Sequence, residues 1–277
     1  MSSPLPSRGP EPACSLDRTL HELDGIIATE RRRRSALGIF PAMYRSVTCD
    51  IQTAVRVGFF DDGRRVERLA VVFADRYVDA YRRWSAGQEP TASWRIAFEA
   101  AESRRRRTIA QHLLAGMNAH INLDLGIVAA EIAGDDPDGL YADFLRVNEI
   151  LFARLDMLQG RLGSVSRRMA IIDRLGGRLD ERLMRLAIAH ARERAWEFTL
   201  ALVGSPTSVP DLIEERDRST ARLGGSILGG SVPIALFNRV VAATEPPDAL
   251  AAIDALADRP VDLAAINVRL APGRDHV

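Results

Sequence analysis

Residues 111–125, QHLLAGMNAHINLDL, have the composition of a helix with no side for solvent. On a 3.6-residue period one side of this helix is a continuous apolar stripe, made of Leu114, Met117, Ile121, Leu125 and Val128. Small residues cover much of the remaining surface and permit close contact between helices: Ala115, Gly116, Ala119 and Gly126. Because a helix that is hydrophobic nearly all round is buried, we expect the fold to be built around this segment.

The polar residues of the same helix fall into two narrow columns. His120, Asp124 and Glu131 lie close together on the helical period, and Gln111, Asn118 and Asn122 cluster on another side. Buried polar groups are costly unless they are paired. The two columns therefore indicate either a functional site or a structural polar network.

Composition excludes several classes of function. Among 277 residues, the 37 basic and 37 acidic side chains cancel, so no overall field attracts nucleic acid. All the basic residues are arginines. The absence of lysine excludes Schiff-base chemistry and Walker-type phosphate loops.

The cysteines and the N-terminus indicate a cytoplasmic protein. Cys14 and Cys49 form no CxxC pair, so neither a disulfide framework nor a thiolate zinc site is supported. Residues 1–14 are rich in proline and serine, lack the apolar core of a secretory signal, and are expected to be a disordered tail. No apolar run reaches the uninterrupted length of a transmembrane segment.

Helical periodicity covers almost all of the remaining chain, and no alternating strand pattern of useful length is present. Apolar periodicity and turn residues predict helices from about Leu16, from Pro41, over 65–84, from Thr91 or Ser93 to about Ala133 with a break near Ser103, over 141–162, near 166–175 and over 179–203. The fold class is all-α: a single helical bundle around the buried central helix. We expect a core domain over 15–203 and short C-terminal helices over 204–277 that pack on it.

Three further polar residues lie on or beside predicted apolar faces. Arg76 projects between Val72 and Ala80, and a buried guanidinium there needs a carboxylate or an anionic ligand. As protein partners for Arg76 we consider Asp124, Asp50 and Glu131. His190 lies in the stripe formed by Leu183, Leu186, Ala187 and Ala201, and Asn148 lies beside the stripe formed by Phe144, Val147, Leu151 and Leu155.

Four segments carry a resemblance to a known family: residues 59–69, 71–77, 91–95 and above all 111–124 with its HxxxxxNxHxNxD pattern. They resemble the domain-of-unknown-function family numbered 5995, which is best represented in actinobacteria. The resemblance covers roughly 16–203 and implies an all-helical domain without an established activity. Ala70 stands where other members carry Asp, so a shared site that used this carboxylate would be altered here.

Three interpretations of the central helix remain open. His120 and Asp124 are spaced i and i+4, so both can reach one divalent metal ion, while His112 lies about 12 Å away along the axis. The same residues can form a structural network in which Asp124 orients His120 and Asn118, Asn122 and Asn148 satisfy one another. In the third interpretation His120, oriented by Asp124, is a general base in an apolar pocket.

We therefore expect an enzyme that acts on a small hydrophobic molecule by hydrolysis or by a cyclisation-type rearrangement. Its predicted catalytic residues are His120, Asp124 and His112, and its predicted substrate-binding residues are Arg76, Asn118, Asn122, Asn148 and His190. The alternative is a non-catalytic binding or scaffold protein. The sequence is also compatible with a homo-oligomer.

Overall fold

The computed structural model describes residues 15–165, 169–229 and 249–256, with side chains described outside 155–185. Within these ranges the fold is all-α and contains no strand, as predicted. The predicted disordered tail, 1–14, lies outside the described residues. The elements are α1 (Leu16–Arg33), η1 (Ala36–Gly38), α2 (Ile39–Arg56), α3 (Gly63–Ser85), α4 (Ala92–Glu102), α5 (Ile109–Ala119), η2 (His120–Asp124), α6 (Leu125–Ala133), α7 (Asp138–Val165), α8 (Met169–Gly204), η3 (Pro206–Ser208), α9 (Val209–Gly229) and α11 (Leu250–Leu256).

Short polar side chains begin several of these helices. The Ser15 side chain accepts a hydrogen bond from the Asp17 backbone N–H at the start of α1. Thr108 and Gln111 form a capping box at the start of α5, directly after the break predicted near Ser103. The first turn of α4 is capped from a distant part of the chain, because the Asp217 carboxylate on α9 accepts from the backbone N–H groups of Ala92 and Ser93.

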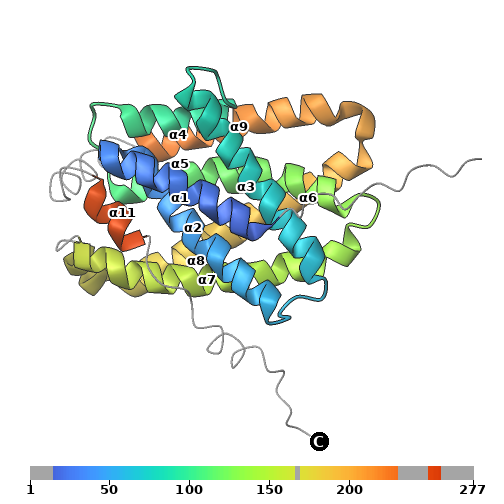
Figure 1. Cartoon of the computed structure of the whole chain (residues 1–277), viewed down its shortest axis with the longest axis horizontal. Coiled ribbons are helices and arrows are strands. Elements are labelled where there is room, and N and C mark those ends of the chain that lie inside the picture. Colours follow the sequence, from blue (N-terminus) through green and yellow to red (C-terminus); the bar gives the residue numbers. More distant parts are fainter. Residues whose placement is uncertain (1–14, 166–168, 230–248, 257–277) are drawn as a thin grey trace, which may run out of the picture.

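The central segment runs as one line through the middle of the bundle, from α5 through η2 to α6 (Figure 1). It packs against α2, α3, α4, α8 and α9. Its middle turn, η2, is a π-helix in which the Leu125 N–H donates to the carbonyl of His120, five residues earlier. Because a π turn inserts one extra residue, the following residues rotate by about 100° relative to an uninterrupted α-helix. Glu131 therefore points to solvent instead of joining the column of His120 and Asp124.

Two glycines of the central segment permit the close helix contacts that the sequence predicts. A Cβ atom on Gly116 would lie 2.5 Å from the Phe40 ring. A Cβ atom on Gly126 would lie 2.6 Å from the Phe198 ring and 2.9 Å from the Ala195 carbonyl oxygen on α8. Glycine at these positions lets α2 and α8 approach the central segment.

The stretch Ile109–Ala133 is apolar and long enough to cross a membrane on length and composition alone, although polar residues such as His112, Asn118 and Asp124 interrupt its apolar run. In the fold, however, 72% of its most apolar window is buried by the surrounding helices. This burial is typical of the core helix of a soluble protein.

The prediction of which face of α8 is buried is wrong. Leu186, Ala187, His190 and Ala201 are exposed. The buried face lies about a third of a turn away and consists of Ile188, Arg192, Ala195, Phe198, Thr199 and Leu202. The α8 helix is also one long element, where two separate helices were predicted.

Candidate functional site

His120 lies in a cage of aromatic rings at the centre of the bundle. The residue is 3% exposed. Its imidazole stacks on the Phe73 ring, with centroids 3.5 Å apart and planes 9° apart, and meets the Tyr44 ring edge-on at 4.4 Å. Phe40 and Trp94 complete the cage. The aromatic residues come from α2, α3 and α4, so tertiary packing assembles this environment.

Asp124, four residues after His120, has a buried carboxylate that accepts hydrogen bonds from two donors. Arg76 donates from Nε to Oδ1 at 2.7 Å, and the Trp94 indole donates to Oδ2 at 2.8 Å. The structure thus confirms that the partner of Arg76 is a protein carboxylate and selects Asp124 among the three candidates. Asp50 instead forms a buried bidentate ion pair with Arg154, and Glu131 points to solvent.

Neither ring nitrogen of His120 has a hydrogen-bond partner among the described residues. Nδ1 lies 3.5 Å from the nearer Asp124 oxygen, outside good hydrogen-bond geometry. Burial lowers the pKa of His120, and the approach of its side chain to the Asp124 carboxylate, together with the charge of that carboxylate, offsets only part of the effect. The imidazole is therefore neutral near pH 7, with one nitrogen protonated and the other able to accept a hydrogen bond. The predicted structural network, in which Asp124 orients His120, therefore lacks its hydrogen bond at His120.

A largely apolar cavity of about 80 Å³ adjoins His120. Its wall is formed by side chains of α2, α3, α7, α8 and the central segment, among them Met43, Val47, Leu69, Phe73, Ile121 and Val147. Ala70, where the family resemblance leads us to expect Asp, also lines this cavity. An aspartate here would place a carboxylate in the wall of a cavity whose described lining contains none.

Arg192 supplies the cavity with a buried positive charge. It is 3% exposed, donates from Nη2 to the Phe144 carbonyl at 3.0 Å and stacks over the Phe144 ring at 4.4 Å. Its Nε has no acceptor among the described residues, and no described carboxylate forms an ion pair with it. Burial lowers its pKa to about 9. Such a guanidinium is costly unless an anion pairs with it.

The donor set around His120 and Asp124 does not fit the predicted metal ion. Across the described side chains, no group of three or more His, Cys, Asp or Glu residues lies in a metal-binding arrangement. The Arg76 guanidinium occupies the neighbourhood of the Asp124 carboxylate where a cation would bind. Repulsion from this guanidinium opposes a cation at Asp124.

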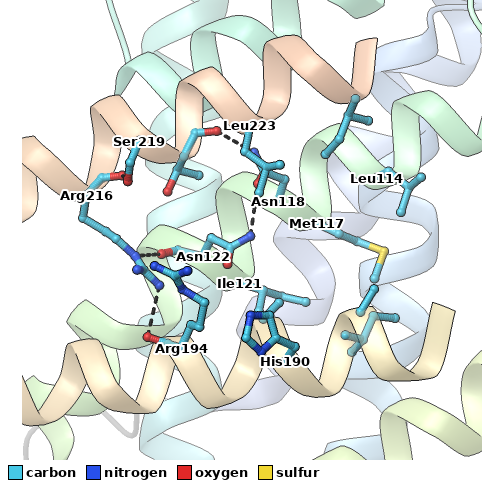
Figure 2. A pocket seen from close by; sticks show the side chains of 15 residues that line it. Leu114, Met117, Asn118, Ile121, Asn122, His190, Arg194, Arg216, Ser219 and Leu223 are labelled. Carbon is cyan, nitrogen blue, oxygen red and sulfur yellow. Dashed lines mark hydrogen bonds between the residues drawn. The ribbon is translucent and has the colours of Figure 1, made fainter. Parts of the chain in front are cut away.

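Apart from Arg76, which binds Asp124, the predicted substrate-binding residues do not gather around His120. Asn118, Asn122 and His190 line a separate cleft between the central segment, α8 and α9 (Figure 2). Asn122 donates to the Asn118 side chain at 3.1 Å, and Asn118 donates to the Thr220 carbonyl at 2.9 Å. The predicted network is thus confirmed for these two residues. His190 was predicted to be buried, but its side chain is 68% exposed, at the rim of the cleft.

His112 and Asn148 belong to neither group. His112 lies two turns before His120, and burial together with the Arg107 charge lowers its pKa to about 4. Its Nδ1 is buried without a partner among the described residues. Asn148, on α7, likewise has a buried Oδ1 with no described partner and does not join Asn118 and Asn122.

Arg192 and the aromatic cage are the features that the sequence interpretation missed. Arg192 lies four residues after Ile188 and three before Ala195 in the true buried stripe of α8. The sequence pattern of an apolar stripe interrupted by one arginine could therefore have identified Arg192 as a buried residue. Selecting the neighbouring face of α8 placed His190 inward instead. No comparable signal joins Phe40, Tyr44, Phe73 and Trp94, which come from three helices.

These features define an all-helical protein with a histidine-containing cavity buried at its centre. The chain belongs to the family of unknown function DUF5995, whose model matches residues 16–230. No curated protein and no solved structure matches the chain.

Proposed function

We propose that this protein binds a small, largely apolar molecule in the His120 cavity. The observation that carries the proposal is the pair of unpaired ring nitrogens on a buried imidazole at the edge of an apolar cavity. Buried polar groups almost always have partners. A ligand with one polar group would provide the partner that the described protein atoms do not.

The shape and charge of the cavity support a ligand with an acidic group. A cavity of about 150 Å³ holds benzene, so 80 Å³ accommodates a group of about three to four carbon atoms. Arg192 lines the same cavity without a described carboxylate partner. A short, branched aliphatic carboxylate would occupy the apolar space and compensate the buried charge.

Conversion of the bound molecule at His120 is the catalytic form of this proposal, and it retains the hydrolysis or rearrangement expected from the sequence. The observation in its favour is Asp124, which Arg76 and Trp94 hold 3.5 Å from Nδ1. A small movement of the imidazole would form the His–Asp hydrogen bond that orients a general base. In the non-catalytic alternative, His120 only contacts the ligand.

Binding is tested by titrating the protein with isobutyrate and with isobutyramide, a neutral molecule of nearly the same shape. We expect isobutyrate to bind more tightly and to perturb the His120 ring resonances in NMR spectra. Arg192→Met should remove the preference for the acid, whereas Arg83→Met, at an exposed position on α3, should retain it. Equal binding of the two molecules to the wild-type protein would contradict the proposed role of Arg192.

Catalysis is tested by incubating the wild-type protein with methyl acetate, an ester no larger than isobutyrate, and measuring acetate and methanol by NMR. Turnover that is lost in His120→Ala supports hydrolysis at this site. Binding of isobutyrate without turnover of the ester supports the non-catalytic alternative for ester substrates.

A further inference from the structure

The cleft that contains Asn118 and Asn122 is a second and larger space, separate from the His120 cavity. Its volume is about 470 Å³, within the range of about 300–1,000 Å³ that is common for small-molecule sites. The α5–η2 segment, α8 and α9 enclose it (Figure 2). Met117 and Ile121 line both spaces, so these two side chains lie between them.

One end of the cleft carries two arginines. Arg216 donates from Nε to the Asn122 carbonyl at 2.6 Å and from Nη2 to the Arg194 carbonyl at 3.1 Å. Figure 2 shows the guanidinium groups of Arg216 and Arg194 next to each other. Among the described side chains, no carboxylate forms an ion pair with either one.

The two positive charges repel each other at this end of the cleft. Burial and the charge of Arg194 both lower the pKa of Arg216, and the charge of Glu197 offsets this only in part. Hydrogen bonds to backbone carbonyls hold Arg216 in place despite the repulsion. An anion bound between the guanidinium groups would relieve it.

The other end of the cleft is apolar. Leu114 and Met117 lie there, away from the arginines, in Figure 2. Ile121, Leu223 and Ile227 extend the apolar lining, and Leu223 is 48% exposed. A ligand that matches the whole cleft therefore has an anionic head and an aliphatic tail.

We infer that this cleft binds a single-chain amphiphilic anion, with its carboxylate or phosphate head at Arg194 and Arg216 and its chain along Leu114, Met117 and Leu223. The inference is independent of the function proposed for the His120 cavity. Both kinds of head present oxygens to paired guanidinium groups in the same way.

The test uses decanoate, decyl phosphate and neutral decanol, each below its aggregation concentration, in calorimetric titrations of the full chain. We expect both anions to bind more tightly than decanol, and the tighter of the two identifies the head group. Isobutyrate, the probe for the His120 cavity, should not displace them. Equal affinity for decanol and both anions would overturn the inference.

Variants locate the binding. Arg194→Gln should weaken binding of the anions about tenfold and leave decanol unchanged, because it removes a charge-assisted hydrogen bond to the anionic head. Leu223→Ser should weaken all three probes. The matched control is Arg222→Gln, an exposed arginine on α9 that does not line the cleft. A loss of anion affinity as large in Arg222→Gln as in Arg194→Gln, or no loss in either variant, would overturn the inference.

Discussion

At the scale of single residues, Asp124 links the helix that carries His120 to two other helices. Its carboxylate is 1% exposed and accepts from Arg76 on α3 and from Trp94 on α4. Arg76 is a third exposed, so the ion pair lies at the edge of the core. The pair fixes the position of Asp124 beside His120 and keeps the buried carboxylate compensated.

Removing Arg76 should therefore leave a buried charge with only the indole as its donor. We expect Arg76→Leu to lower the free energy of unfolding by about 2–4 kcal/mol. This range is smaller than for a fully buried ion pair, because the arginine is partly exposed. Adding Asp124→Asn should restore part of the loss by removing the charge. Arg83→Leu, which breaks an exposed pair on the same helix, should change stability by no more than about 0.5 kcal/mol. Urea denaturation of the wild-type protein, Arg76→Leu, the double variant and Arg83→Leu provides the measurement. A loss of unfolding free energy below about 1 kcal/mol in Arg76→Leu would contradict this account.

At the scale of elements, the central segment combines close packing with a change of helical register. Gly116 and Gly126 admit Phe40 and Phe198 at distances that a Cβ atom would not permit. Between the two glycines, η2 rotates α6 relative to α5. The segment therefore presents His120 and Asp124 to α3 and α4, and Asn118 and Asn122 to α9.

Substitution of two glycines by alanine should have opposite effects on the stability of the protein, because only one of the two glycines is in close contact with another helix. Gly126→Ala should destabilise the protein by about 1–3 kcal/mol, because the Ala195 backbone carbonyl has no freedom to move away. Gly25→Ala, within α1 and with no atom near the added methyl, should stabilise it by about 0.5–1 kcal/mol. Thermal denaturation of both variants provides the measurement. A stabilising Gly126→Ala would show that α8 can move away from the central segment.

At the scale of the whole molecule, α11 belongs to the main hydrophobic core although it lies beyond the family match. Ile253 and Leu256 are fully buried, and α11 packs mainly against α2 and α7, with fewer contacts to α1. The Ser46 hydroxyl on α2 donates to the Leu256 carbonyl at 2.9 Å, and the Gly38 backbone lies close against Ile253. The described part of the C-terminal region is thus packed into the bundle.

We expect Ile253→Ala to lower the free energy of unfolding by about 2–5 kcal/mol and to leave a single cooperative transition. Asp254→Ala, also on α11, changes only an exposed ion pair with Arg31 of α1 and should have an effect of about 0.5 kcal/mol or less. Circular dichroism and tryptophan fluorescence should report the same midpoint. An Ile253→Ala variant as stable as the wild-type protein would show that α11 contributes little to the fold.

Helical periodicity and turn residues were enough to establish the all-α class, the buried central segment, the break before Thr108 and the need of Arg76 for a negative partner. These properties depend on local spacing and on the cost of burying charge, both of which are readable along one chain. Tertiary packing decided the rest. It selected the buried face of α8, where several faces are similarly apolar, and so placed Arg192 inward and His190 outward. It brought together the aromatic cage from three helices, and the single added residue of η2 separated His120 from Glu131, because a change in register rotates every side chain that follows.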